Sequence, residues 1–122
     1  MARILLVSVK KDNLSDLANG LSTAEDVDLH RAESGVSALR SAARLSPRLV
    51  VIDEEIGDMA PLDLVVGLLE LDATIATAVL SKMPPEEFHE ASEGLGVMAQ
   101  LPPQAGREHV AQLLQKLKAV QV

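Results

Sequence analysis

Cysteine is absent from this 122-residue sequence, and Phe88 is its only aromatic residue. Without cysteine the chain forms neither disulfide bonds nor thiolate metal sites, and the redox state of its compartment is left open. A core must therefore be built from aliphatic side chains, which a hydrophobic content of 48% can supply. A chain of this length is expected to fold as one domain spanning residues 1–122.

Positive charge is also scarce, because 11 Lys and Arg stand against 18 Asp and Glu and give a net charge of -7. Nucleic-acid binding depends on Lys and Arg that neutralise phosphates, so this balance argues against nucleic acid and against anionic membranes. No apolar run approaches the ~20 residues of a membrane span. Residues Met1 to Val9 lack the pattern of a signal peptide. We therefore expect a cytoplasmic protein that binds neither nucleic acid nor membranes.

The most informative stretch runs from Pro47 to Asp53. Four consecutive apolar residues, Leu49 to Ile52, lead directly into a carboxylate, and a continuous apolar run is typical of a strand buried on both faces. Asp53 then stands where the strand leaves the sheet, and in open parallel sheets sites form at the carboxyl ends of strands. The alternative is that Asp53 only ends the strand and faces water.

The rest of the chain alternates strand-like and helix-like segments. This order predicts a three-layer α/β/α sandwich around a parallel sheet. The expected strands are Ile4–Val7, Val27–Arg31 at a half-exposed sheet edge, Pro47–Asp53, Ile75–Leu80 and Val97–Leu101. Five helices are expected. The first is capped by Asp12 or Asn13 and has Leu14, Leu17, Ala18 and Leu21 on one face, and the second is capped by Ser34 and has Val36, Leu39 and Ala43 on one face. The third runs from Pro61 to about Leu71, the fourth opens at Pro84 and Pro85, and the last carries Val110, Leu113, Leu114, Leu117 and Val120.

This pattern resembles the response-regulator receiver domain of two-component (phosphorelay) signalling over essentially the whole chain. The resemblance implies a flavodoxin-like fold with a five-stranded parallel sheet of order 2-1-3-4-5, in a single receiver-like domain of residues 1–122. The segments that carry it are Arg3–Val7, Ser34–Leu39, Pro47–Asp53, Thr77–Ser81 and Gly96–Pro102.

The resemblance also implies roles for single residues. Asp53 matches the aspartate that takes a phosphoryl group from the histidine of a partner kinase, and Ser81 matches the hydroxyl that contacts the phosphoryl oxygens. The two acidic residues that hold magnesium in the family are replaced here by Ser8 and Val9. Asp53 is then the only matched carboxylate, so the resemblance predicts weak magnesium binding.

Two further family positions are also changed. If the stretch from Gly96 aligns without a gap, the family's lysine is replaced by Pro103 and the proline that follows it by Gln104. A one-residue gap places Pro102 at the lysine and Pro103 at the proline. The aromatic residue of the fifth strand is replaced by Gln100. The pocket formed by Ser8, Val9 and Pro103 is therefore degenerate.

Neighbouring charged residues offer replacements. Lys10 and Lys11 are expected to lie in a solvated loop, and the alternative is that one of them pairs with Asp53 and holds the site in one state. Lys82 replaces the missing ammonium only if its loop redirects it. Asp12, Glu54 or Glu55 could replace the missing magnesium ligands only if their loops rearranged in a similar way.

These observations predict a receiver-like domain, or pseudo-receiver, that acts through a protein partner with phosphorylation impaired or lost. It has no catalytic residue, no metal and no cofactor, and it is not an enzyme. One alternative is a working receiver, a phosphoprotein modified on Asp53 by a histidine kinase through an unusual magnesium site. The other is a small-ligand-binding module of another flavodoxin-like class, although the turn from Ser8 to Asn13 contains no glycine with which to cradle a phosphate.

An apolar stripe on the helix that begins at Pro61 predicts an interface. At ~100° per residue, Leu64, Val65 and Leu68 form one apolar stripe, and Leu62, Val66 and Leu69 form a second beside it. The family resemblance assigns the first stripe to the core, so the second is expected to be partly exposed. A surface helix normally has one apolar face. Either a neighbouring loop or helix covers the second stripe, or it docks a protein partner or a second copy in a homodimer.

Overall fold

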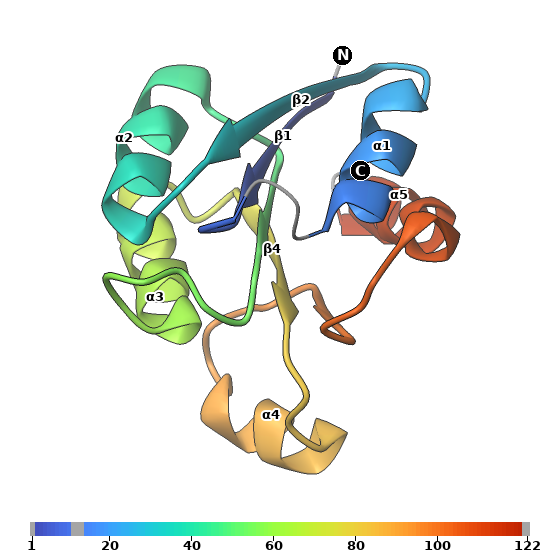
Figure 1. Ribbon diagram of the computed structural model, residues 1–122. Coiled ribbons are helices and arrows are strands. Elements are labelled where there is room, and N and C mark those ends of the chain that lie inside the picture. The colour runs from blue at the N-terminus through green and yellow to red at the C-terminus, as the bar shows by residue number, and fades with distance from the viewer. Residues whose placement is uncertain (1, 11–13, 121–122) are drawn as a thin grey trace.

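A five-stranded parallel sheet forms the centre of the computed structural model, which describes residues 2–10 and 14–120. The strands lie in the order β2-β1-β3-β4-β5 (Figure 1), so the predicted class and strand order are confirmed. The strands are β1 (Ala2–Val7), β2 (Val27–Ala32), β3 (Leu49–Ile52), β4 (Ala76–Leu80) and β5 (Ala99–Leu101). The helices are α1 (Ser15–Thr23), α2 (Gly35–Leu45), α3 (Pro61–Leu71), α4 (Pro85–Ala91), the short 3-10 helix η1 (Arg107–His109) and α5 (Val110–Val120).

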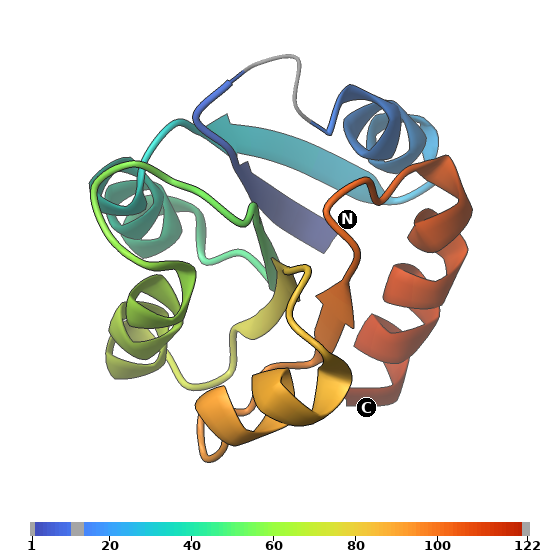
Figure 2. The same ribbon diagram turned by 60° about the horizontal axis from the view of Figure 1, so that its bottom comes forward.

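Helices cover both faces of the sheet, with α1 and α5 on one side and α2 and α3 on the other (Figures 1 and 2). Each side has its own aliphatic core. Leu49 and Val51 of β3 point into the α1–α5 core, while Val50 and Ile52 point into the α2–α3 core. All four residues of β3 are buried, as the continuous apolar run predicts. The strand ends at Ile52, so Asp53 stands just beyond it.

Helix α1 and strand β2 agree with the sequence except at the helix start. Leu17, Ala18 and Leu21 are buried as predicted, and β2 lies at a sheet edge. The predicted cap at Asp12 or Asn13 lies outside the described residues. The residue before the helix is Leu14, which has a left-handed φ of 65° and makes no side-chain cap.

Helix α2 has its predicted cap, but the prediction of its apolar face was wrong. The Ser34 hydroxyl accepts a hydrogen bond from the Ser37 amide. The buried residues are Gly35, Ala38 and Ala42, whereas Val36 is 46% exposed; Ala43 is exposed and Leu39 half-buried. Small residues let the helix lie close to its neighbours, and a Cβ built on Gly35 would lie 2.5 Å from the Met59 sulfur.

Helix α3 matches its predicted bounds, Pro61–Leu71. Leu64, Val65 and Leu68 are buried. In the second stripe, Leu62 and Leu69 are half-buried against the α2–α3 core and Val66 is 38% exposed, so the stripe is partly exposed as predicted. Each helix in the described part of the chain is too short or too polar to cross a bilayer.

Candidate functional site

Three polar side chains follow three neighbouring strands at the same edge of the sheet. Ser8 follows β1, Asp53 follows β3 and Ser81 follows β4. Val7 pairs with Ile52, which sets Ser8 beside Asp53. Because Ile52 pairs with Val79, Ser81 stands one residue further along its strand than Asp53 does. The structure therefore brings the two residues that the family resemblance singled out, and the replacement at position 8, to one edge.

Ser8 and Asp53 are hydrogen-bonded to each other in a buried place. The Ser8 hydroxyl lies 3.0 Å from Oδ2 of Asp53, and the two residues are 6% and 4% exposed. The Glu54 amide donates to Oδ1 of Asp53 at 2.8 Å. The same Ser8 hydroxyl is 3.0 Å from the Lys10 carbonyl, so one proton is shared between two acceptors. Both carboxylate oxygens of Asp53 thus have donors from the chain itself.

This donor set does not fit magnesium. The ion prefers near-octahedral coordination by oxygen and is usually held by one or two carboxylates. Ser8 replaces one of them with a hydroxyl, and Val9 is apolar and 47% exposed. Glu54 and Glu55 are exposed, and no group of three acidic, histidine or cysteine side chains in the described residues is arranged to hold a metal.

The predicted charge partners are only partly described. Lys10 and Lys82 are exposed. Lys11 and Asp12 lie outside the described residues, so the pairing of a lysine with Asp53 stays a prediction. Pro103 is half-buried and follows the exposed Pro102 after β5.

Ser81 takes part in a hydrogen-bonded loop between β4 and α4. Its hydroxyl accepts from the Met83 amide at 3.1 Å. Nε2 of Gln100 in β5 donates to the Met83 carbonyl at 2.7 Å and lies 3.3 Å from the Ser81 carbonyl. Gln100 therefore ties this loop to β5, whereas the sequence showed it only as a replacement for an aromatic residue.

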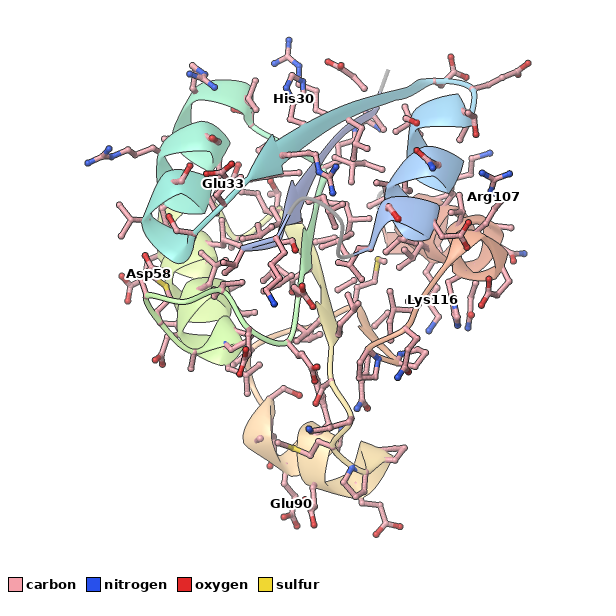
Figure 3. All side chains as sticks on the ribbon, viewed as in Figure 1. His30, Glu33, Asp58, Glu90, Arg107 and Lys116 are labelled. Carbon is pink, nitrogen blue, oxygen red and sulfur yellow. The ribbon has the colours of Figure 1, made fainter. Side chains whose placement is uncertain are left out.

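Asp58 is a structural residue that the sequence did not reveal. Its carboxylate accepts from the amides of Gly35 at 2.8 Å and Val36 at 3.0 Å, at the start of α2 (Figure 3). The hydrogen bonds from Val36 and Gly35 hold the pKa of Asp58 below its ordinary value. The sequence held only an indirect signal for such an acceptor. The first turn of α2 has no acidic residue of its own to accept these amides, so an acceptor from elsewhere in the chain was needed.

Comparison with known proteins identifies the fold. No protein-family model and no curated protein matches the sequence. A CheY-like response-regulator receiver domain protein from Methanospirillum hungatei superposes with a TM-score of 0.85 at 18% identity, over 99% of this chain and 97% of the other. Chemotaxis response regulator CheY4 of Vibrio cholerae gives 0.84 at 18% identity, over 96% and 98%.

A third match is to NtrX from Brucella abortus, with a TM-score of 0.84 at 20% identity. It covers 98% of this chain, which spans only 28% of the NtrX chain. At these identities the likeness establishes a shared fold. The flavodoxin-like fold of response-regulator receiver domains is thus the fold of this chain.

Proposed function

We propose that this chain is a receiver-like domain of a two-component signalling pathway, in which it acts through protein contacts with phosphoryl transfer to Asp53 impaired or lost. The observation that carries the proposal is the buried hydrogen bond between Ser8 and Asp53, at the place where the family resemblance calls for a magnesium site. The partner is a signalling protein such as a histidine kinase, and a second copy of the chain is considered below. We assign no catalytic residue and no cofactor, and a cytoplasmic location stays a prediction.

The physical basis of the proposal is charge. A carboxylate and a phosphoryl group repel each other, and a metal ion that bridges them offsets this repulsion. Asp53 has Ser8 and the Glu54 amide as donors, but these neutral groups cannot replace a divalent cation. Phosphorylation is therefore slow even though the acceptor carboxylate and the Ser81 hydroxyl are both present.

Intact mass spectrometry after incubation with acetyl phosphate and magnesium tests this proposal. We expect no increase in mass for the wild-type chain. The variant Ser8→Asp with Val9→Asp restores two carboxylates at the edge of the sheet and is expected to gain a magnesium-dependent phosphoryl group. Adding Asp53→Asn to that variant should remove the gain.

The same experiment has an outcome that favours the alternative function. The presence of both Asp53 and Ser81 at one edge is the observation on which a working receiver would rest. A magnesium-dependent mass increase in the wild-type chain, absent in Asp53→Asn, would establish Asp53 as a phosphoacceptor and overturn the proposal.

A further inference from the structure

An apolar groove lies between α3 and α4, which are neighbours at the lower left of Figure 2. The groove encloses about 460 Å³. Its lining includes Leu62 of α3, Val79 and Leu80 of β4, and Phe88 of α4, with Met83 beside them. Met83 is 38% exposed.

The second stripe of α3 extends this groove along the helix. Gly67 faces α2, because a Cβ built on it would lie 3.1 Å from the Leu39 side chain. With ~100° per residue, Leu62 and Leu69 fall about 140–160° from Gly67, and Val66 lies on the same flank at about 100°. Val66 is therefore the outer, solvent-exposed edge of the stripe.

The rims of the groove carry mostly acidic side chains, although Lys82 lines the groove together with Glu54. Asp63 and Glu70 of α3 are exposed and, on the helical repeat, lie on the solvent side of Val66. Pro85, His89 and Ser92 of α4 line a different hollow together with Lys116 of α5. The helical repeat consequently turns Glu87 toward the α3 side. A groove with an apolar floor and carboxylate rims fits a basic amphipathic helix.

The chain itself carries such a helix face on α2. Val36, Arg40, Ala43 and Arg44 are all exposed, and at ~100° per residue they form one side of the helix. Val36 to Ala43 spans two turns, about 10.5 Å, which is the same length as Leu62 to Leu69. In a chain with a net charge of -7, these two arginines place positive charge next to an exposed valine.

We propose that the α3–α4 groove binds the outer face of α2 of a second copy of this chain. Val36 packs into the apolar groove, while Arg40 and Arg44 lie against the carboxylates on its rims. The inference rests on the part of the proposed function that has the domain act through protein contacts, and it does not depend on whether Asp53 takes phosphate. The groove lies on the side of α3 away from α2, so the α2 face of one copy meets the groove of another copy.

Sedimentation velocity over a concentration series up to the millimolar range, at low salt, tests the proposal. We expect the wild-type sedimentation coefficient to rise with concentration. A helix variant, Arg40→Glu with Arg44→Glu, and a groove variant, Val66→Glu, should each associate at least tenfold more weakly. Val66 is chosen alone because Leu69 packs against the core.

Mixing the two variants is the decisive step. The helix variant keeps an intact groove and the groove variant keeps an intact α2 face, so an equimolar mixture should form a heterodimer and stop there. The matched control for the helix variant is Lys116→Glu with Lys118→Glu. It changes the net charge by the same amount as the helix variant does, at exposed positions of α5, and it should associate like the wild type. If Val66→Glu unfolds by circular dichroism, Glu70→Lys with Glu87→Lys serves as the groove variant.

Several outcomes would overturn the inference. These are a wild-type chain that stays monomeric at every concentration, a helix or groove variant that associates like the wild type, and a mixture that fails to recover association. Loss of association in the α5 control would show that net charge alone governs it. No phosphoryl donor is present, so failure here leaves the proposed loss of phosphorylation to be decided by the mass measurement.

Discussion

At the scale of single residues, the Ser8 hydroxyl contacts the Asp53 carboxylate directly. A carboxylate at position 8 would repel Asp53 unless a cation lay between them, whereas the Ser8 hydroxyl donates a hydrogen bond at 3.0 Å. A hydrogen bond to a charged group stabilises a fold by roughly 1.5–3 kcal/mol. Asp53 is thereby accommodated at 4% exposure with protein donors on both of its oxygens.

Replacing Ser8 by alanine removes one of these donors. We expect Ser8→Ala to lower the free energy of unfolding by ~1–2 kcal/mol, because Asp53 keeps the hydrogen bond from the Glu54 amide. Urea denaturation with an unchanged m value would measure the loss. The control is Ser22→Ala, which removes an exposed hydroxyl bonded within its own helix and should change stability by less than about 0.5 kcal/mol. Equal effects of the two substitutions would show that the Ser8 bond contributes nothing of its own.

The sequence predicted where the site residues lie but not how they bond. The apolar runs before Ser8, Asp53 and Ser81 mark the ends of three strands, and parallel strands bring those ends to one edge. The bonds of Ser8 to Asp53 and of Gln100 to Met83 depend on strand register and side-chain rotamers. Neither property can be obtained from residue spacing alone.

Among the structural elements, α2 depends on two acceptors from different parts of the chain. Ser34 caps the helix from its own end, and Asp58 reaches it from the loop between β3 and α3. The first amides of a helix have no partner within the helix, so these oxygens satisfy them. The next residue, Met59, packs over Gly35. The loop after Asp53 is thereby fixed to the start of α2.

This contact makes the stability of the fold depend on pH. The pKa of Asp58 is lowered in the folded state, so its contribution is fully present above the ordinary carboxyl pKa of about 4 and is lost as the pH falls through the lowered folded pKa. We expect Asp58→Asn to be less stable than the wild type at neutral pH and the difference to shrink in acid. Urea midpoints measured across this range test the expectation. The control is Glu55→Gln at an exposed position of the same loop, for which the difference in urea midpoint from the wild type should not shrink in acid. A difference for Asp58→Asn that stays constant with pH would contradict the role given to Asp58.

The prediction for α3 was more accurate than the prediction for α2. In α3 the starting proline and Leu71 gave the bounds, and the family resemblance correctly assigned Leu64, Val65 and Leu68 to the core. In α2 the periodicity gave weight to Val36 and Leu39, whereas the sheet packs against Ala38 and Ala42. Alanine contributes little to a hydrophobic pattern, yet it permits close packing that only the tertiary structure reveals.

Across the whole molecule, the uneven distribution of charge gives salt two opposite effects. A net charge of -7 disfavours the compact state through self-repulsion, which salt screens. Salt should also screen the attraction between Arg40 and Arg44 and the acidic groove rims. We expect sodium chloride to raise the urea midpoint of the dilute monomer and to weaken association in sedimentation. The variant Lys116→Glu with Lys118→Glu is four charges more negative and should show the larger rise in midpoint, while a midpoint that falls with salt would contradict the role of self-repulsion.

The way in which α4 is attached sets how often it leaves the sheet. Phe88 is its only buried residue, and Gln100 ties the preceding loop by bonds to the Met83 and Ser81 carbonyls. Burial of one phenylalanine and two hydrogen bonds amount to roughly 3–5 kcal/mol, so α4 is detached in between about one in a hundred and one in several thousand molecules. Detachment removes one wall of the α3–α4 groove without breaking a strand pair. Occupation of the groove and release of α4 therefore exclude each other, and a bound second copy makes the open population smaller.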